Sequence, residues 1–211
     1  GECPILIYSP REDTVYFVSG QGRAPRAMTL DRLRRAGIDM IPGDGFLGAT
    51  VPGLFGAYCT ALCRWGRLSL EQVIAPAIEY ATEGFPVYEG LFLPIRNAAE
   101  RIRTWPSTGD IYLNQGAAVA TGSLLRQPDL ARTFHRIVER ERRSRSRGRE
   151  EAILSAQEWF YSAEIAETIL EFSRNTPVLD ATGTAHTAIL DREDFFAHTT
   201  VVEYPVSSQY R

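Results

Sequence analysis

The residues that could most readily contact a ligand lie in a short loop, Gly20-Gln21-Gly22-Arg23-Ala24-Pro25. Two glycines on either side of a polar side chain allow a backbone to approach another group closely. The spacing differs from that of a dinucleotide-binding or phosphate-binding loop. Two interpretations stay open at this point: a loop that faces a ligand, and a tight turn that leaves a strand.

Few other residues suggest chemistry. The cysteines, Cys3, Cys59 and Cys63, lack the spacing of a metal site, and the last two suit small hydrophobic positions on one helix. The chain contains no lysine, so a lysine Schiff base or a lysine general base is excluded within it. We therefore expect no metal, no cofactor and no disulfide framework.

The 211 residues are 44% apolar and carry a formal charge of −3. This composition suits a globular core and gives no reason to expect a nucleic-acid partner. No apolar run approaches the ~18 residues of a membrane span. Localisation stays open between cytoplasm, periplasm and secretion, with a slight preference for the cytoplasm. A chain that opens Gly-Glu-Cys without methionine is expected to be part of a longer polypeptide.

Two helices are expected to organise the chain. The first runs from Leu54 to Trp65, after the turn Thr50-Val51-Pro52-Gly53, and Gly66 is expected to end it in a left-handed conformation. The second follows Ser69, which forms a capping box with Gln72, and ends at Gly84.

The other expected elements come from apolar runs and turn residues. Residues 3–8 and 14–19 predict a β-hairpin covered on both faces, and 199–206 predict a strand. Further helices are expected over 30–36, 91–103 and 159–172, and one begins at Pro128. We expect surface loops at 105–121 and at the Arg/Ser-rich segment 140–149. The predicted fold class is α+β, mainly helical, within a single partial domain over residues 1–211.

Seven motifs occur in an order that resembles one family: the loop at 20–25, TVPG (50–53), APAIEYATEGFPV (75–87), GSLLRQPDLARTF (122–134), FYSAEIAETI (160–169), LDREDF (190–195) and YPVSSQYR (204–211). The chain resembles an interior part of the large subunit of the γ-glutamyltransferase (glutathione hydrolase) family. The resemblance implies part of a four-layer αββα N-terminal-nucleophile hydrolase, made as a precursor that cuts itself. A threonine nucleophile then attacks an amide carbonyl and forms an acyl-enzyme.

The resemblance also assigns a role to the loop. Family members that handle glutathione carry an arginine here that pairs with the glutamyl α-carboxylate, and Gln21 takes its place in this chain. Glutamine lacks the charge and the bidentate geometry that suit a carboxylate. Arg23, two positions along, is expected to substitute in part. Gln21 and Arg23 are thus the candidate substrate-binding residues, and the departure is similar to the acylase-like branch of the family, which includes cephalosporin acylase relatives.

The family's threonine nucleophile is expected beyond Arg211, so we expect no catalytic residue in this chain and an inactive isolated fragment. His198-Thr199-Thr200 has the residue types of a processing site, but the following Val-Val-Glu favours a strand. The expected partners are a small γ-glutamyl or acyl amide and the remainder of the chain's own precursor, including its small subunit.

Three functions are compared. The first is an autoprocessed amide hydrolase or acyltransferase. The second is a binding module that uses the arginines of 140–149 for an anionic partner, against which a solvated loop is favoured because no aromatic residues interleave with them. The third is a family member without activity. A threonine nucleophile encoded downstream of Arg211 would support the first.

Overall fold

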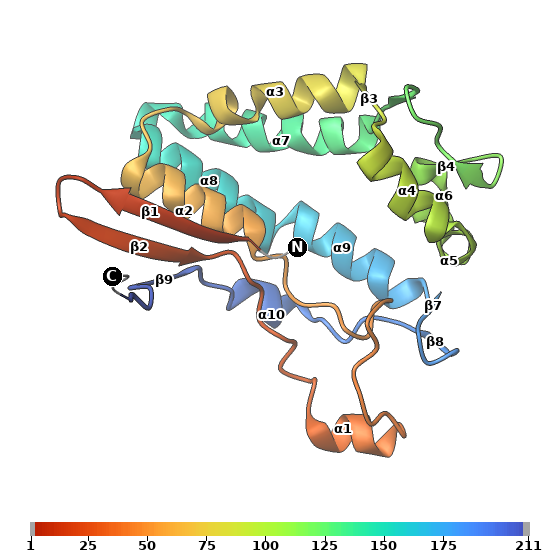
Figure 1. The fold of residues 1–211 in the computed structure, drawn as a ribbon. Helices are drawn as coiled ribbons and strands as arrows, with labels where there is room; N and C mark the ends of the chain where they lie inside the picture. The colour runs from red at the N-terminus through yellow and green to blue at the C-terminus, as the bar shows by residue number, and fades with distance from the viewer. Residues whose placement is uncertain (1–2, 209–211) are drawn as a thin grey trace.

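The computed structural model describes residues 3–208, and the fold is α+β (Figure 1). A three-stranded sheet has the order β1-β2-β9, formed by β1 (Pro4–Ser9), β2 (Thr14–Ser19) and β9 (Val201–Glu203). Both pairings are antiparallel, and Val18 of β2 lies opposite Val202 of β9. The predicted hairpin and C-terminal strand are therefore confirmed, and β9 begins two residues later than expected.

The two faces of the hairpin differ. Val18 is fully buried on the side of α2 (Leu54–Trp65), which packs against β2 (Figure 1). On the other face Leu6, Tyr8 and Val15 are 65%, 57% and 40% exposed. The expectation that the hairpin is covered on both faces is thus wrong for the described residues, because none of them packs over this second face.

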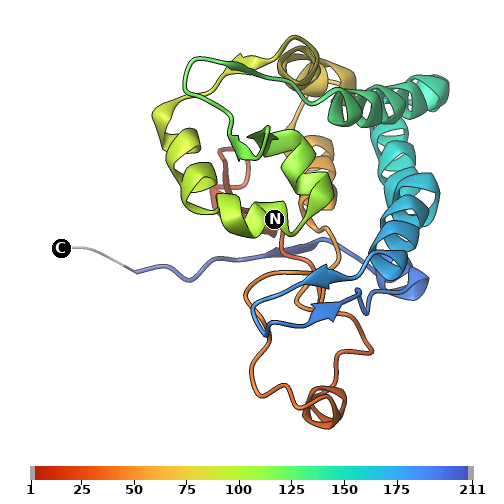
Figure 2. The ribbon, with the colours of Figure 1, turned by 90° about the vertical axis from the view of Figure 1, so that its right-hand side faces the viewer.

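Four long helices accompany α2: α3 (Leu70–Glu83), α7 (Pro128–Ser144), α8 (Arg149–Ser162) and α9 (Glu164–Asn175). Helix α3 lies along α7, which packs on α8, and α8 also contacts α2 (Figures 1 and 2). Their shared core contains small and branched side chains: Cys59, Leu70, Ile137, Ile153 and Ala156. Cys59 thus occupies the hydrophobic position expected for it.

Helix α2 has the predicted bounds, but its end differs from the expectation. Gly66 has an extended backbone, with φ −84° and ψ 167°, instead of a left-handed one. Arg149 explains the difference, because its guanidinium donates to the carbonyl oxygens of Leu62 and Cys63 at 3.1 Å each. These carbonyls belong to the last turn of α2, so a side chain from α8 satisfies them.

Helix α3 begins and ends as predicted. Ser69 and Gln72 form both hydrogen bonds of the capping box, and Gly84 follows the last turn with φ 89°. A positive φ of this kind is easily adopted by glycine alone.

The Arg/Ser-rich segment 140–149 is not a surface loop. Helix α7 continues through Ser144, a 3-10 turn covers η1 (Arg145–Arg147), and α8 begins at Arg149. Arginine is a good helix former, and both Arg142 and Arg145 form ion pairs with Glu71 of α3. The sequence prediction was wrong because these partners lie far away along the chain.

Residues 89–118 form a small unit at one end of the molecule (Figure 1). It contains α4 (Glu89–Asn97), α5 (Ala99–Arg103), α6 (Pro106–Tyr112) and the short pair β4 (Leu113–Asn114) and β5 (Ala117–Ala118). The helix expected over 91–103 is broken at Ala98, and the loop expected over 105–121 is largely α6 and the β4–β5 pair. Pro106 occupies the first turn of α6, where it needs no backbone hydrogen bond.

This unit is attached through Arg101, which forms a bidentate pair with Asp44 at 2.8 Å. Trp105 Nε1 donates to the carbonyl of Leu179 at 2.8 Å. Leu179 belongs to β7 (Val178–Leu179), which pairs with β8 (Ala185–His186).

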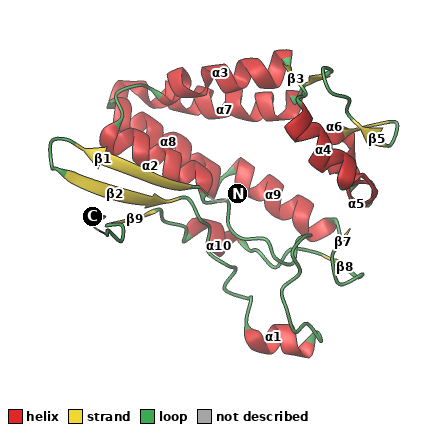
Figure 3. Cartoon of the chain, viewed as in Figure 1, coloured by secondary structure: helices red, strands yellow, loops and turns green. Residues whose placement is uncertain are grey.

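The remaining elements are short (Figure 3): α1 (Leu30–Arg35), α10 (Arg192–Phe196), and β3 (Phe85–Pro86) paired with β6 (Leu124–Leu125). Thr29 caps α1, and Asp191 caps α10 in a capping box with Asp194. The helix expected over 159–172 is instead two helices that meet at Ala163. The last three residues of the motif at 204–211 lie outside the described range.

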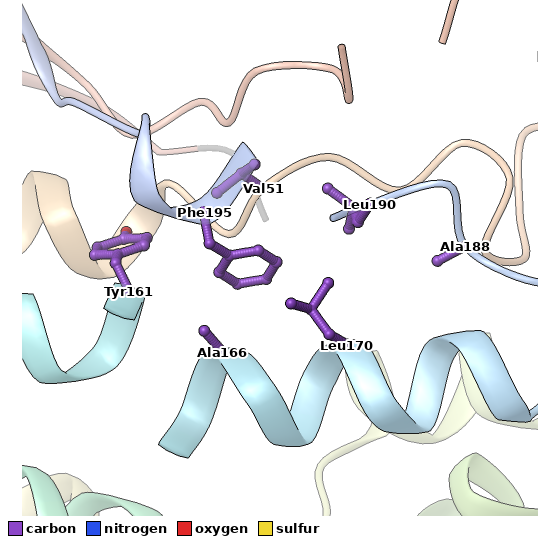
Figure 4. Close-up of a cluster of buried hydrophobic side chains, with 7 residues drawn as sticks. All are labelled: Val51, Tyr161, Ala166, Leu170, Ala188, Leu190 and Phe195. Carbon is purple, nitrogen blue, oxygen red and sulfur yellow. The ribbon is translucent and has the colours of Figure 1, made fainter. Parts of the chain in front are cut away.

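A second core surrounds Phe195, whose side chain is fully buried. Figure 4 shows its ring among Val51, Leu170 and Tyr161. Val51 comes from the turn before α2, Leu170 from α9 and Tyr161 from α8. The turn at 50–53 is thus anchored in the interior by Val51.

Candidate functional site

The predicted substrate-binding residues lie on the loop between β2 and α1. Gln21 and Arg23 are both exposed, whereas Pro25 is buried. The structure brings the two side chains onto the same short segment, which leaves the end of the sheet beside the turn at 50–53.

Backbone hydrogen bonds hold this loop at three points. The N–H of Gly20 donates to the carbonyl of Cys3 at 2.9 Å, and the N–H of Val51 donates to the carbonyl of Arg23 at 3.1 Å. The N–H of Arg26 donates to the buried carboxylate of Asp194 at 3.0 Å. The loop is therefore tied to the hairpin, to the turn at 50–53 and to α10. These three elements lie far apart in the sequence.

Glycines allow the loop and the turn to lie in direct contact. A Cβ on Gly22 would overlap with the carbonyl oxygen of Val51. A Cβ on Gly53 would lie 2.8 Å from the carbonyl carbon of Gln21. Neither position has room for a side chain, so the two backbones pack against each other and the position of one fixes the position of the other.

The turn at 50–53 is held in turn by Tyr161. The phenol oxygen lies 2.7 Å from the carbonyl oxygen of Pro52, to which it donates, and accepts from the N–H of Gly56 at 3.0 Å. Burial raises the pKa of Tyr161 to about 12, so the phenol is protonated and can donate at neutral pH. Gly53 stands at the start of α2 without a capping side chain, and Tyr161 supplies the missing acceptor.

His198 and Thr200 lie beside Tyr161 and the first turn of α2, near Gly56. The rings of His198 and Tyr161 have centroids 4.9 Å apart. Burial, and then the positive charge of Arg23, lower the pKa of His198 and favour the neutral imidazole. The ring nitrogens of His198 and the hydroxyl oxygen of Thr200 are buried and have no hydrogen-bond partner among residues 3–208.

The geometry gives these residues no arrangement of a nucleophile and its base. Thr200 Oγ1 is hydrogen-bonded to none of the described groups, and Thr199 is exposed just before β9. What the arrangement offers is an exposed guanidinium, that of Arg23, and an exposed amide, that of Gln21, on a tightly held backbone. Such groups can bind the carboxylate or carbonyl oxygens of a ligand.

The two cavities of greatest volume among those found lie away from this loop. The larger, about 820 Å³, is bordered by the hairpin turn and the end of α2, and includes Arg11, Cys63 and Arg67. The other, about 480 Å³, lies along α8 and includes Gln157, Tyr161 and His198. Gln21 and Arg23 line neither. Within the part of the chain that the structure describes, no three His, Cys, Asp or Glu side chains are grouped as metal ligands, and no helix is long and apolar enough to cross a membrane.

The comparisons with known proteins agree with this fold. Residues 1–211 match the family described as gamma-glutamyltranspeptidase, and the chain belongs to that family. Glutathione hydrolase-like YwrD proenzyme of Bacillus subtilis (strain 168) is 29% identical over 212 residues, which are 100% of this chain and 35% of that protein. The chain thus spans about a third of the length of this curated relative.

Solved structures with more than 25% sequence identity share the fold, including the following two. That of LmbA2991HD superposes with a TM-score of 0.91 and 31% identity, over 100% of this chain and 36% of that one. That of cephalosporin acylase from Bacillus halodurans has a TM-score of 0.75 and 26% identity, over 98% of this chain and 35% of the other. The predicted class, an α+β part of an N-terminal-nucleophile hydrolase, is confirmed.

Sequence reasoning found the loop but missed the side chain that supports it. In the sequence Tyr161 is only one letter of the motif at 160–169. A tyrosine at the buried end of a helix needs a partner for its hydroxyl group, and this is the signal that could have drawn attention to it. The partner could not be named, because Pro52 lies far from Tyr161 in the sequence.

Proposed function

We propose that the full-length protein is an amide hydrolase or acyltransferase that cleaves γ-glutamyl or related acyl amides. The observation that carries the proposal is the loop at 20–23, which places Gln21 and Arg23 on a backbone fixed by the hairpin and the turn at 50–53. Membership of the gamma-glutamyltranspeptidase family supports it. The threonine nucleophile is supplied by a part of the precursor outside this chain.

The substrate preference follows from the loop. Glutamine at position 21 makes the glutamyl α-carboxylate a weak anchor, because a neutral amide gives up the charge-assisted pair. Arg23 recovers part of the attraction from a neighbouring position. We therefore propose a bias towards acyl amides without a free amino-acid head group, in agreement with the likeness to a cephalosporin acylase.

The proposed partner is the remainder of the precursor. Relatives named as proenzymes support a chain that is cut into two subunits. The exposed apolar face of the hairpin, formed by Leu6, Tyr8 and Val15, is where a second layer of the precursor packs in this proposal. Burying such side chains is favourable by roughly 25 cal/mol per Å².

The arginine-rich helix end supports a binding module less well. Arg142 and Arg145 are paired with Glu71, and Arg143 with Glu139. Arg149 donates to two carbonyl oxygens in the last turn of α2 and to that of Leu68, just before α3. Arginines that already have partners must lose them before they can bind an external anion.

The test uses the purified full-length protein with a γ-glutamyl anilide and a glutaryl anilide, which differ in the α-amino and α-carboxylate groups. We expect hydrolysis of both, with a higher kcat/KM for the glutaryl compound. Hydrolysis of neither would contradict the proposed function. A strong preference for the γ-glutamyl compound would contradict the assignment of substrate preference to Gln21.

A further inference from the structure

We propose that Tyr161 is a positioning residue for the substrate loop at 20–23, acting through the turn at 50–53. This inference rests on the proposed function, in which that loop binds the substrate. The two hydrogen bonds of the Tyr161 hydroxyl group go to the turn and to α2. Its effect on the loop is transmitted by two close contacts, one on each side of the turn.

The first contact is between Tyr161 and the turn. Its hydroxyl group bridges the carbonyl of Pro52 and the N–H of Gly56, at 2.7 and 3.0 Å. The bridge fixes both sides of Gly53, the residue at which the turn becomes a helix. Tyr161 is only 6% exposed, so losing the hydroxyl group leaves its backbone partners without a hydrogen bond in a largely buried setting.

The second contact is between the turn and the loop. Val51 donates to the carbonyl of Arg23, and Gly53 lies against the backbone of Gln21. Because Gly22 leaves no space between its Cα and the carbonyl of Val51, a shift of the turn must shift the loop. Packed interiors transmit such displacements instead of absorbing them.

The Tyr161 hydroxyl group and Thr200 both lie close to Gly56. A Cβ on Gly56 would lie 3.1 Å from the Tyr161 hydroxyl oxygen and 2.7 Å from Thr200 Oγ1. The His198 ring lies against the Tyr161 ring at an interplanar angle of 32°. Tyr161 is therefore held by contacts at its hydroxyl group and on its ring, and its position determines where the turn, and with it Gln21 and Arg23, can lie.

Two variants of the full-length protein test the inference. Tyr161→Phe keeps the ring and its packing but removes both hydrogen bonds. Gly56→Ala keeps the tyrosine but crowds its hydroxyl group. Glu141→Ala is the control for a general loss of stability, because Glu141 contacts the start of α3 and not the turn. Each protein is examined by steady-state kinetics and by hydrogen exchange of the peptide that covers residues 20–26.

We expect Tyr161→Phe to raise KM by about tenfold, the effect of one buried hydrogen bond, while kcat changes by less than about threefold. Exchange at 20–26 should rise by a similar factor, and Gly56→Ala should act in the same direction. Glu141→Ala should lower the melting temperature without raising KM or the exchange at 20–26.

Three results would overturn the inference. The first is folded Tyr161→Phe and Gly56→Ala proteins with unchanged KM and unchanged exchange at 20–26. The second is exchange that rises throughout the chain and not selectively at 20–26, which would make the role merely structural. The third is failure of both variants to fold, which would assign Tyr161 to the fold and not to the loop. If the unmodified protein hydrolyses neither anilide, the proposed function fails, and exchange alone decides the inference.

Discussion

The carboxylate of Glu141 accepts hydrogen bonds from the backbone N–H groups of Leu70 at 2.6 Å and of Glu71 at 2.9 Å. Glu141 belongs to α7, and its side chain is buried, with 1% exposure of the residue. It therefore neutralises the start of α3 from a neighbouring helix, beside the local capping box of Ser69 and Gln72. A negative charge at this end of a helix is favourable, and more so out of water.

Glu141→Ala should lower the free energy of unfolding by about 2–3 kcal/mol, because two buried N–H donors lose a charged acceptor. Urea unfolding of the full-length protein measures the change. The control is Glu139→Ala, on the exposed side of α7, where the ion pair with Arg143 is open to solvent. That substitution should cost about 0.5 kcal/mol or less. Equal losses for both would contradict the assigned role of Glu141.

The stability of the α3–α7 contact should depend on pH through Glu71. Hydrogen bonds from Arg142, and then from Arg145, lower the pKa of Glu71 to about 2, from 4.5 without them. A carboxylate whose pKa is depressed by folding binds fewer protons in the folded state. Its stabilising contribution is therefore complete above about pH 4.5 and is lost as the pH falls towards 2.

Glu71→Gln should accordingly lower the melting temperature at pH 6 and make no difference near pH 2. Added salt should reduce the difference at pH 6, since the pairs with arginine are open to solvent. Glu79→Gln on the same helix is the control, because Glu79 is exposed and has no ion pair within the described range. A Glu71 effect that grows on acidification would contradict the expected sign of the pH dependence.

Gly22→Ala should displace the substrate loop, because the added methyl group would overlap with the carbonyl of Val51. We expect KM for the anilide substrates to rise by at least about tenfold, since small misplacements of binding groups are costly. Gly43→Ala is the matched control, as a Cβ there meets no atom within 4 Å. Normal kinetics for Gly22→Ala would show that the loop does not bind the substrate.

Gln21→Arg should restore a charged partner for the glutamyl α-carboxylate. We expect kcat/KM for the γ-glutamyl anilide to rise by about ten- to a hundredfold relative to the glutaryl anilide. Met40→Arg adds the same charge at a position that is 82% exposed and outside the loop, and it should leave the ratio unchanged. An unchanged ratio in Gln21→Arg would mean that the α-carboxylate is held elsewhere.

The sequence predicted the bounds of a helix best where residues next to its ends form hydrogen bonds with the terminal N–H and C=O groups. The capping box of Ser69 and Gln72 fixes the start of α3, and Gly84 its end, so both were correct. Helix α2 was also bounded correctly, but a left-handed Gly66 is not what ends it. The carbonyls of its last turn are satisfied by Arg149, which no local pattern could reveal.

The predictions of surface loops were wrong where they relied on amino-acid composition, because the conformation also depends on contacts with residues distant in the sequence. The arginines of 140–149 indicated a solvated loop, yet two of them pair with Glu71, one from α7 and one from the 3-10 turn that follows it. Pro106 and Gly109 indicated a loop, although a proline fits the first turn of α6. For the candidate site, the loop with Gln21 and Arg23 came from a sequence motif, whereas the contact of Tyr161 with Pro52 could be found only in three dimensions.

The pairing of β2 with β9 has a consequence for synthesis of the protein. Phe17 lies opposite Glu203, so the sheet cannot be completed until almost the whole of this chain has left the ribosome. At translation rates of roughly 5–20 residues per second, the hairpin is without its third strand for roughly 10–40 s. Helices α7, α8 and α9 are neighbours in sequence and can pair as they emerge, whereas β1 and β2, made before these helices, acquire their third strand only after them. During this interval the edge of β2 that later pairs with β9 is open, and an unpaired strand edge is a site that a chaperone can bind.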